Sequence, residues 1–218
     1  MARPMQHLLH SNQIALSCNS GCICGCVIDQ SFLLFLGQLP SAPSSARVAL
    51  WRRLRGAGAA SVMNGAWVLP RTDGHASFFA QLAEIVRGQG GNALVFPIEE
   101  MGPAETESLV ASFRSDRGRE YGEFAERCRA FLAEIEREKQ RRKFTFAELE
   151  EIEDDFEKLT TWLGKIRARD FFPSEQSRIA ADTLERCGTA LKAFAEAVYK
   201  HEGIALPDDT ADEANGLA

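Results

Sequence analysis

Five arginines between residues 47 and 71 form a group of side chains that could bind a charged partner. Arg47, Arg52, Arg53 and Arg55 fall within nine residues, and Arg71 follows two short segments later. On a helix, which turns by about 100° per residue, Arg52 and Arg55 share a face. Guanidinium groups gathered in this way can hold the phosphates or bases of DNA, and they can equally form an ordinary solubilising surface. The five arginines are therefore candidate DNA-binding residues, with both interpretations open.

A second charged group, Arg167, Arg169 and Asp170, stands directly before Phe171 and Phe172. One interpretation is a structural clamp, in which the arginines cap the preceding helix and Asp170 fixes the following turn. In that case the two phenylalanines would fill the space between packed helices. The other interpretation is an anion site, since paired guanidinium groups offer several donors to an oxyanion.

Patterns typical of catalysis or of metal and cofactor binding are missing from the sequence. Two of the four histidines, His7 and His10, lie at the start of the chain, and no H-E-x-x-H or Walker A pattern occurs. Six acidic residues between positions 148 and 155 would spread around a helix, which favours a solvated face over a carboxylate metal site. We therefore predict no catalytic residue, no metal site and no cofactor.

Four of the six cysteines, Cys18, Cys22, Cys24 and Cys26, lie in the first thirty residues. Thiolates this close in sequence could hold a soft metal only by wrapping tightly around it. Small residues before Cys18 are similar to a lipoprotein signal, but polar residues interrupt the apolar run that such a signal needs. The favoured interpretation of residues 1–30 is an unstructured leader, which could be an extension upstream of the natural start.

The remaining two cysteines indicate the cellular compartment. Cys128 and Cys187 fall on helical apolar faces and are predicted to be reduced core residues, which favours the cytoplasm. The most apolar stretch, residues 23–39, is interrupted by Asp29 and Gln30. It is too short to cross a bilayer, so no membrane-spanning helix is expected.

Residues 31–98 show the alternation of a β-α-β-β-α-β unit. The apolar run of residues 32–36 predicts a buried central strand, and the helix after it ends at Gly56 and Gly58. Asn64-Gly65 between two apolar segments predicts a hairpin. A helix capped by Thr72 and a last strand ending near Ile98 complete the unit. This order predicts a ferredoxin-like, four-stranded antiparallel sheet with both helices on one face.

Residues 99–203 are predicted to form a helical unit, which gives the chain an α+β fold class. A short helix begins at Pro103, a longer one covers residues 121–135, and Thr145 with Glu148 forms a capping box for a third. The last helix begins after Pro173. The narrow apolar stripes predict an antiparallel helical bundle or hairpin. Residues 204–218 are acidic and are predicted to be a disordered tail.

The two predicted units differ in charge. Residues 1–98 carry seven basic and three acidic residues, whereas the remaining 120 residues of the 218 carry eighteen basic and twenty-eight acidic ones. The first part is therefore net positive by 4 and the second net negative by 10. A basic patch attracts polyanions and an acidic half repels them, so the sheet unit is the better candidate for a nucleic-acid partner.

Two strings of residues resemble a known family. The first combines Leu39-Pro40, Arg47, Trp51-Arg52-Arg53-Leu54, Gly58-Ala59, Gly65 and Trp67-Val68-Leu69-Pro70. The second is Arg167-Ala168-Arg169-Asp170-Phe171-Phe172, between two long helices. Together they are similar to the N-terminal domain of the ChrB chromate-resistance regulators, over about residues 31–200.

This resemblance implies a bacterial cytoplasmic protein of a chromate-resistance operon, from a family of DNA-binding repressors that chromate releases. Full-length members continue into a second domain to which oxyanion sensing is attributed, and we expect that domain to be missing from this chain. The related sheet unit of phenylacetate-pathway repressors resembles a dimerisation module. A homodimer is therefore an expected assembly.

Three functional hypotheses follow. The first is a chromate-responsive transcription regulator that binds operator DNA through the helix containing Arg47 to Arg55. The second is a dimerising interaction module that supports a separate sensor protein and binds no DNA. The third is a detoxification or redox enzyme, which would need a pocket containing perturbed titratable groups. None of the three involves a membrane.

Overall fold

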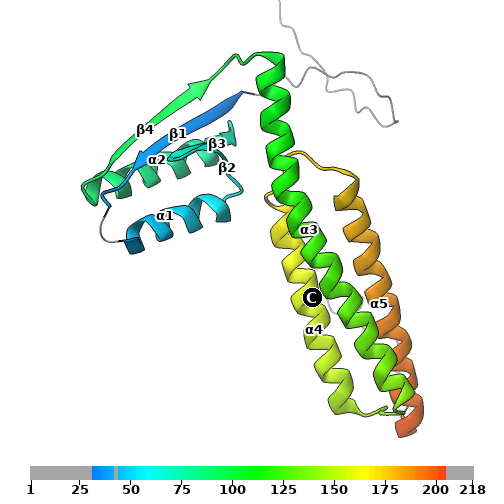
Figure 1. Ribbon diagram of the computed structural model, residues 1–218. Helices are drawn as coiled ribbons and strands as arrows, with labels where there is room; N and C mark the ends of the chain where they lie inside the picture. The colour runs from blue at the N-terminus through cyan, green and yellow to red at the C-terminus, as the bar shows by residue number, and fades with distance from the viewer. Residues whose placement is uncertain (1–30, 42–43, 205–218) are drawn as a thin grey trace, which may run out of the picture.

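The computed structural model describes residues 31–41 and 44–204, and their first part forms a four-stranded antiparallel sheet (Figure 1). The predicted leader, residues 1–30, and residues 205–218 of the predicted tail lie outside the described residues. The sheet unit consists of β1 (Phe32–Gln38), α1 (Ser44–Gly56), β2 (Ala60–Met63), β3 (Ala66–Pro70), α2 (Asp73–Gly88) and β4 (Asn92–Ile98). The strand order is β2-β3-β1-β4. This arrangement confirms the predicted ferredoxin-like unit.

The helices α1 and α2 cover the same face of the sheet (Figure 1). Strand β1 lies between β3 and β4 and pairs with both, which explains its unbroken apolar sequence. Leu33 and Phe35 point from β1 into a core that Leu54 of α1 and Phe79 of α2 complete. The core thus holds α1 on the sheet through the side of the helix that contains Leu54, and the opposite side of α1 is exposed.

The Asn64-Gly65 turn forms the predicted hairpin between β2 and β3. Gly65 has a φ of +76°, a conformation that side chains disfavour, and a Cβ there would lie 2.7 Å from the carbonyl oxygen of Gly37. The amide of Gly37 donates a hydrogen bond of 2.8 Å to the carbonyl of Gly65. The hairpin tip is thereby held against the end of β1.

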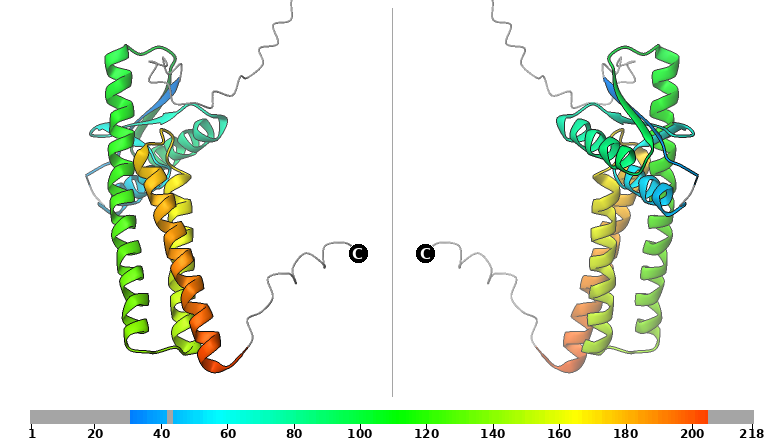
Figure 2. Two further views of the ribbon diagram at one scale, coloured as in Figure 1. Left: turned by 90° about the vertical axis from the view of Figure 1, so that its right-hand side faces the viewer. Right: turned by 90° about the vertical axis from the view of Figure 1, so that its left-hand side faces the viewer.

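Three helices form an antiparallel bundle next to the sheet unit (Figure 2). They are α3 (Pro103–Gln140), α4 (Phe146–Arg167) and α5 (Glu175–Glu202). Thr145 caps α4 by accepting a hydrogen bond from the amide of Glu148, which is half of the predicted capping box. Cys128 and Cys187 are buried and free in the bundle core, as predicted.

The prediction of two separate helices between residues 103 and 135 is wrong, because α3 is one continuous helix of 38 residues. The apolar stripe passes from Phe113 to Tyr121 through Arg117, so the pattern looks interrupted where the helix continues. A Cβ at Gly118 would lie 2.4 Å from the Gln176 side chain, so this glycine permits a close approach at the start of α5.

The first turns of α3 pack on the sheet face opposite to α1 and α2. Leu109, Val110 and Phe113 contact Phe32 of β1 and Val68 of β3. Figure 1 shows that α3 crosses the sheet at one end, so no other described helix covers the rest of this face. Among the described helices, none has a stretch long and apolar enough to cross a membrane. The division at residue 98 into a sheet unit and a helical unit stays a prediction.

Candidate functional site

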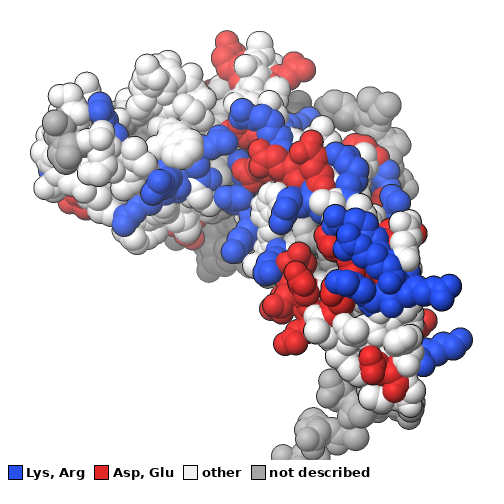
Figure 3. Space-filling view, turned by 60° about the horizontal axis from the view of Figure 1, so that its bottom comes forward, with Lys and Arg blue, Asp and Glu red and all other residues white. Residues whose placement is uncertain are grey.

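Three of the five candidate DNA-binding arginines are exposed on α1. Arg47, Arg52 and Arg53 form no ion pair with any described residue. Helix α1 contains no acidic residue, and Leu54 is its only buried side chain. Basic side chains cross this part of the surface in Figure 3. Their positive charge is therefore available to an external polyanion.

The other two arginines of the group are engaged within the protein. Arg55 donates to Asp116 of α3 at 2.6 Å, with its side chain partly buried. Arg71, between β3 and α2, donates to Glu99 at 3.3 Å on the surface. The structure thus places Arg47, Arg52 and Arg53 on different sides of α1, since they lie about 100–140° apart around the helix. It gives Arg55 and Arg71 acidic partners.

Arg55 belongs to a cluster of charged side chains at the contact between the sheet unit and the bundle. We call this set the junction cluster: Arg55, Asp116, Arg117, Arg119, Glu120, Tyr121, Arg169 and Asp170. Asp116 binds both Arg55 and Arg119. Glu120 binds Arg117 at 3.2 Å and Arg169 at 2.9 Å. Two carboxylates of α3 therefore bind four guanidinium groups, which come from α1, from α3 itself and from the turn after α4.

Arg117 is the most buried charge in the junction cluster, with a side chain only 3% exposed. Burial lowers the pKa of its guanidinium, and Glu120 opposes this change by favouring the charged form. Its Nη1 atom has no hydrogen-bond partner among the described residues. The buried charge thus depends on Glu120 for its stabilisation.

The second candidate group, Arg167, Arg169 and Asp170, lies where α4 ends. Asp170 accepts a hydrogen bond of 2.8 Å from the Tyr121 hydroxyl, and burial together with this carboxylate raises the pKa of Tyr121. Arg169 is bound to Glu120, whereas Arg167 is exposed in the last turn of α4, where its charge opposes the helix dipole. Arg169 and Asp170 therefore bind side chains of α3. The structural clamp and the anion site both stay predictions.

Phe171 and Phe172 connect the end of α4 to the sheet. Phe172 packs on Phe113 of α3 and on Phe32 of β1, with ring centroids 5.3 and 6.4 Å apart. Phe171 packs on Phe113 and, edge to face, on His75 of α2. The two rings therefore bring β1, α2 and α3 together, and they fix the sheet unit on the bundle beside the junction cluster.

The turn after α1 contacts the segment after α4 that contains Arg169 and Phe171. Gly58 has a φ of +81°, and a Cβ at this position would lie 2.9 Å from the Cβ of Arg169. Only glycine accommodates both the backbone conformation and the close approach. The position of α1, with its three free arginines, is thus set partly by Arg169.

Replacing Gly58 with alanine is expected to lower the free energy of unfolding by about 1–3 kcal/mol, because the methyl group would strain the backbone and press on Arg169. Gly56→Ala is the matched control, since no atom lies within 4 Å of a Cβ there. Urea unfolding monitored by circular dichroism gives the free energy of unfolding of both variants. Equal stability of the two variants would contradict the packing described above.

The sequence did not point to Asp116, Arg117, Arg119, Glu120 and Tyr121 as members of a site. One signal was available, because Arg117 occupies a position of the α3 stripe where an apolar residue belongs. Such a residue predicts a buried charge that needs a partner. Elsewhere, no group of three or more metal-ligating side chains gathers among the residues that the structure describes.

The fold and the site define an α+β protein in which a small ferredoxin-like unit with a basic helix is fixed to a helical bundle. Comparison with protein families matches residues 47–204 to the family described as Protein ChrB, N-terminal. The chain belongs to this family, which confirms the resemblance predicted from the sequence. The matched residues begin at Arg47 and include most of α1, the junction cluster and the whole bundle.

A curated relative supports the same assignment. The chain is 25% identical over 149 residues to Protein ChrB of Cupriavidus metallidurans (strain ATCC 43123 / DSM 2839 / NBRC 102507 / CH34). The alignment covers 68% of this chain and 43% of the relative. The chain thus spans less than half of the length of that protein.

Proposed function

We propose that the chain is a transcription regulator of a chromate-resistance system, acting in the cytoplasm, that binds operator DNA through α1. The observation that carries this proposal is the exposure of Arg47, Arg52 and Arg53 on a helix without acidic residues. Exposed guanidinium groups without internal partners gain most from DNA phosphates. Membership of the ChrB N-terminal family supports the regulatory role.

A salt titration tests the proposal. Fluorescence anisotropy of labelled duplex DNA from the chain's own promoter region is measured against protein at two salt concentrations. If the three arginines neutralise three phosphates, affinity is expected to fall about 40-fold between 50 and 200 mM salt. Chromate is then added to the complex, and release of the DNA is expected. Absence of salt-sensitive binding would contradict the proposed DNA-binding function.

A second candidate function is a dimerising interaction module that supports a separate sensor protein. The uncovered part of the sheet favours it, because Leu94 and Phe96 of the edge strand β4 expose about half of their side-chain surface. An edge strand offers unpaired backbone groups to a second copy of the same strand. A homodimer through β4 would continue the sheet and place the same apolar side chains of the second copy beside Leu94 and Phe96.

Replacing Phe96 with serine is expected to convert this homodimer into a monomer, because the substitution removes apolar area from the centre of the contact. Ile179→Ser on α5 is the matched control, since Ile179 is 48% and Phe96 45% exposed. Light scattering coupled to size-exclusion chromatography gives the molecular mass of each variant in solution. A monomeric parent protein at micromolar concentration, or equal masses for the two variants, would refute the β4 interface.

A further inference from the structure

A hollow between α1, the β2–β3 hairpin and α3 offers hydrogen-bond donors. Its volume is about 490 Å³. The residues that line it are Trp51, Arg55, Ser61, Asn64, Gly65, Trp67 and Arg119. Each of the six side chains other than glycine has at least one N–H or O–H group, and no carboxylate lines the hollow. Such a lining favours a negatively charged ligand.

The two arginines of the hollow are oriented by one carboxylate behind them. Asp116 binds both Arg55 and Arg119, and its side chain is only 13% exposed. One negative charge therefore faces two positive ones, and the wall of the hollow stays net positive. Guanidinium groups held in this way need little reorganisation to bind a phosphate.

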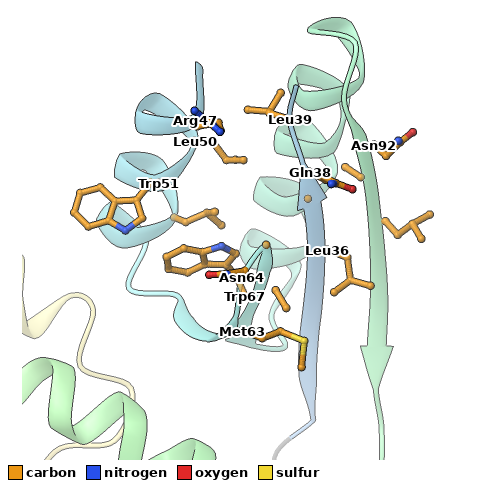
Figure 4. Close-up of a pocket in the computed structure, with 16 residues that line it drawn as sticks. Leu36, Gln38, Leu39, Arg47, Leu50, Trp51, Met63, Asn64, Trp67 and Asn92 are labelled. Carbon is orange, nitrogen blue, oxygen red and sulfur yellow. The ribbon is translucent and has the colours of Figure 1, made fainter. Parts of the chain in front are cut away.

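An exposed indole stands beside these arginines. Trp51 is 53% exposed and makes no hydrogen bond or ring contact with another described residue. Arg47 and Arg55 flank it at the neighbouring turns of α1. Figure 4 shows Trp51, Trp67 and Asn64 grouped at one end of the adjoining pocket. A free aromatic face between cations is suited to stacking with a planar ring.

The adjoining pocket adds polar groups that could contact such a ring. It has a volume of about 800 Å³ and shares Trp51, Asn64, Gly65 and Trp67 with the first hollow. The amide side chains of Gln38 and Asn92 also line it, among apolar residues of β1, α1 and β4. Amide groups can both donate to and accept from the edge of a nucleobase.

We propose that these two connected hollows bind a nucleoside phosphate, with the phosphate on Arg55 and Arg119 and the base on Trp51. The ligand is either a free nucleotide or an unpaired nucleotide of a nucleic-acid strand, because both present the same chemistry. This site shares Arg47 with the proposed DNA-binding surface, whereas Arg52 and Arg53 do not line it. The proposal does not depend on binding of duplex operator DNA.

Calorimetric titration of the full chain tests the site with four kinds of probe: the nucleoside 5′-monophosphates, the corresponding nucleosides, inorganic phosphate and short single-stranded oligonucleotides. We expect at least one monophosphate or oligonucleotide to bind about tenfold more tightly than the nucleoside or phosphate alone. Tighter binding of the monophosphate identifies a free nucleotide as the ligand, and tighter binding of the oligonucleotide identifies a strand. Equal binding of inorganic phosphate, or no binding of any probe at millimolar concentration, would overturn the proposal.

Two substitutions assign the binding to these residues. Arg119→Ala is expected to weaken it about tenfold, whereas Arg129→Ala leaves it unchanged. The two arginines are matched, because both lie on α3, are 68% and 69% exposed and pair with an acid three residues earlier. Trp51→Leu is expected to weaken binding and Trp51→Phe to retain it, since only the latter keeps an aromatic face. Equal affinities for the two arginine variants, or for the leucine variant and the parent, would refute the assigned geometry.

Discussion

Replacing Glu120 with alanine is expected to lower the free energy of unfolding by about 3–5 kcal/mol, because the change leaves a buried arginine without its carboxylate. Arg117, 3% exposed, and Arg169 both lose their ion-pair partner. Two cationic groups would then face each other at the contact between the sheet unit and the bundle. Chemical unfolding monitored by circular dichroism gives the free energy.

Glu126→Ala is the control for this prediction, since Glu126 forms an ion pair with Arg129 on the exposed side of the same helix. Its loss is expected to cost less than about 0.5 kcal/mol. A double-mutant cycle with Arg117→Met separates the buried charge from the other contacts of Glu120. With methionine at position 117, the Glu120→Ala substitution is expected to cost much less. A similar cost in both backgrounds would show that Arg117 is not the group that Glu120 stabilises.

Replacing Arg52 and Arg53 together with alanine is expected to weaken binding of operator DNA about 100-fold, taking about 1.4 kcal/mol for each charged contact. Both side chains are exposed and form no ion pair with a described residue, so the fold loses no contact of this kind. The slope of log affinity against log salt is expected to fall by about 2. Anisotropy titrations at several salt concentrations measure both quantities.

Arg127→Ala combined with Arg129→Ala removes the same charge from the exposed surface of α3 and is the matched control. If this control weakens binding as much as the α1 substitutions, the effect comes from net charge and not from α1. If the parent protein binds no DNA but forms the β4 homodimer, the interaction module becomes the better function.

Much of the sheet unit could be predicted because its signals are local. The Asn64-Gly65 pair fixes a hairpin, and the apolar run of β1 identifies the central strand. The continuity of α3 could not be predicted by the same method. Arg117 interrupts the apolar stripe there. Its buried charge is paired with Glu120, which also binds Arg169 from the segment after α4.

The candidate site was predictable only in part, for a related reason. The helix pattern placed Arg47, Arg52 and Arg53 on α1, but no local pattern shows that Arg55 pairs with Asp116, 61 residues further on. In the same way, Asp170 lies 49 residues from its partner Tyr121. Long-range pairs depend on how the units pack, and a sequence pattern reports only neighbours along one element.

The continuous helix α3 also has a mechanical consequence. With a rise of about 1.5 Å per residue, its nineteen residues after the junction cluster form a stiff arm about 28 Å long. A tilt of about 10° around the cluster would displace the tip of that arm by about 5 Å. A partner that binds the distal end of the bundle and tilts α3 would therefore move the junction cluster. Through Arg55 and Arg169, this movement would change the orientation of α1.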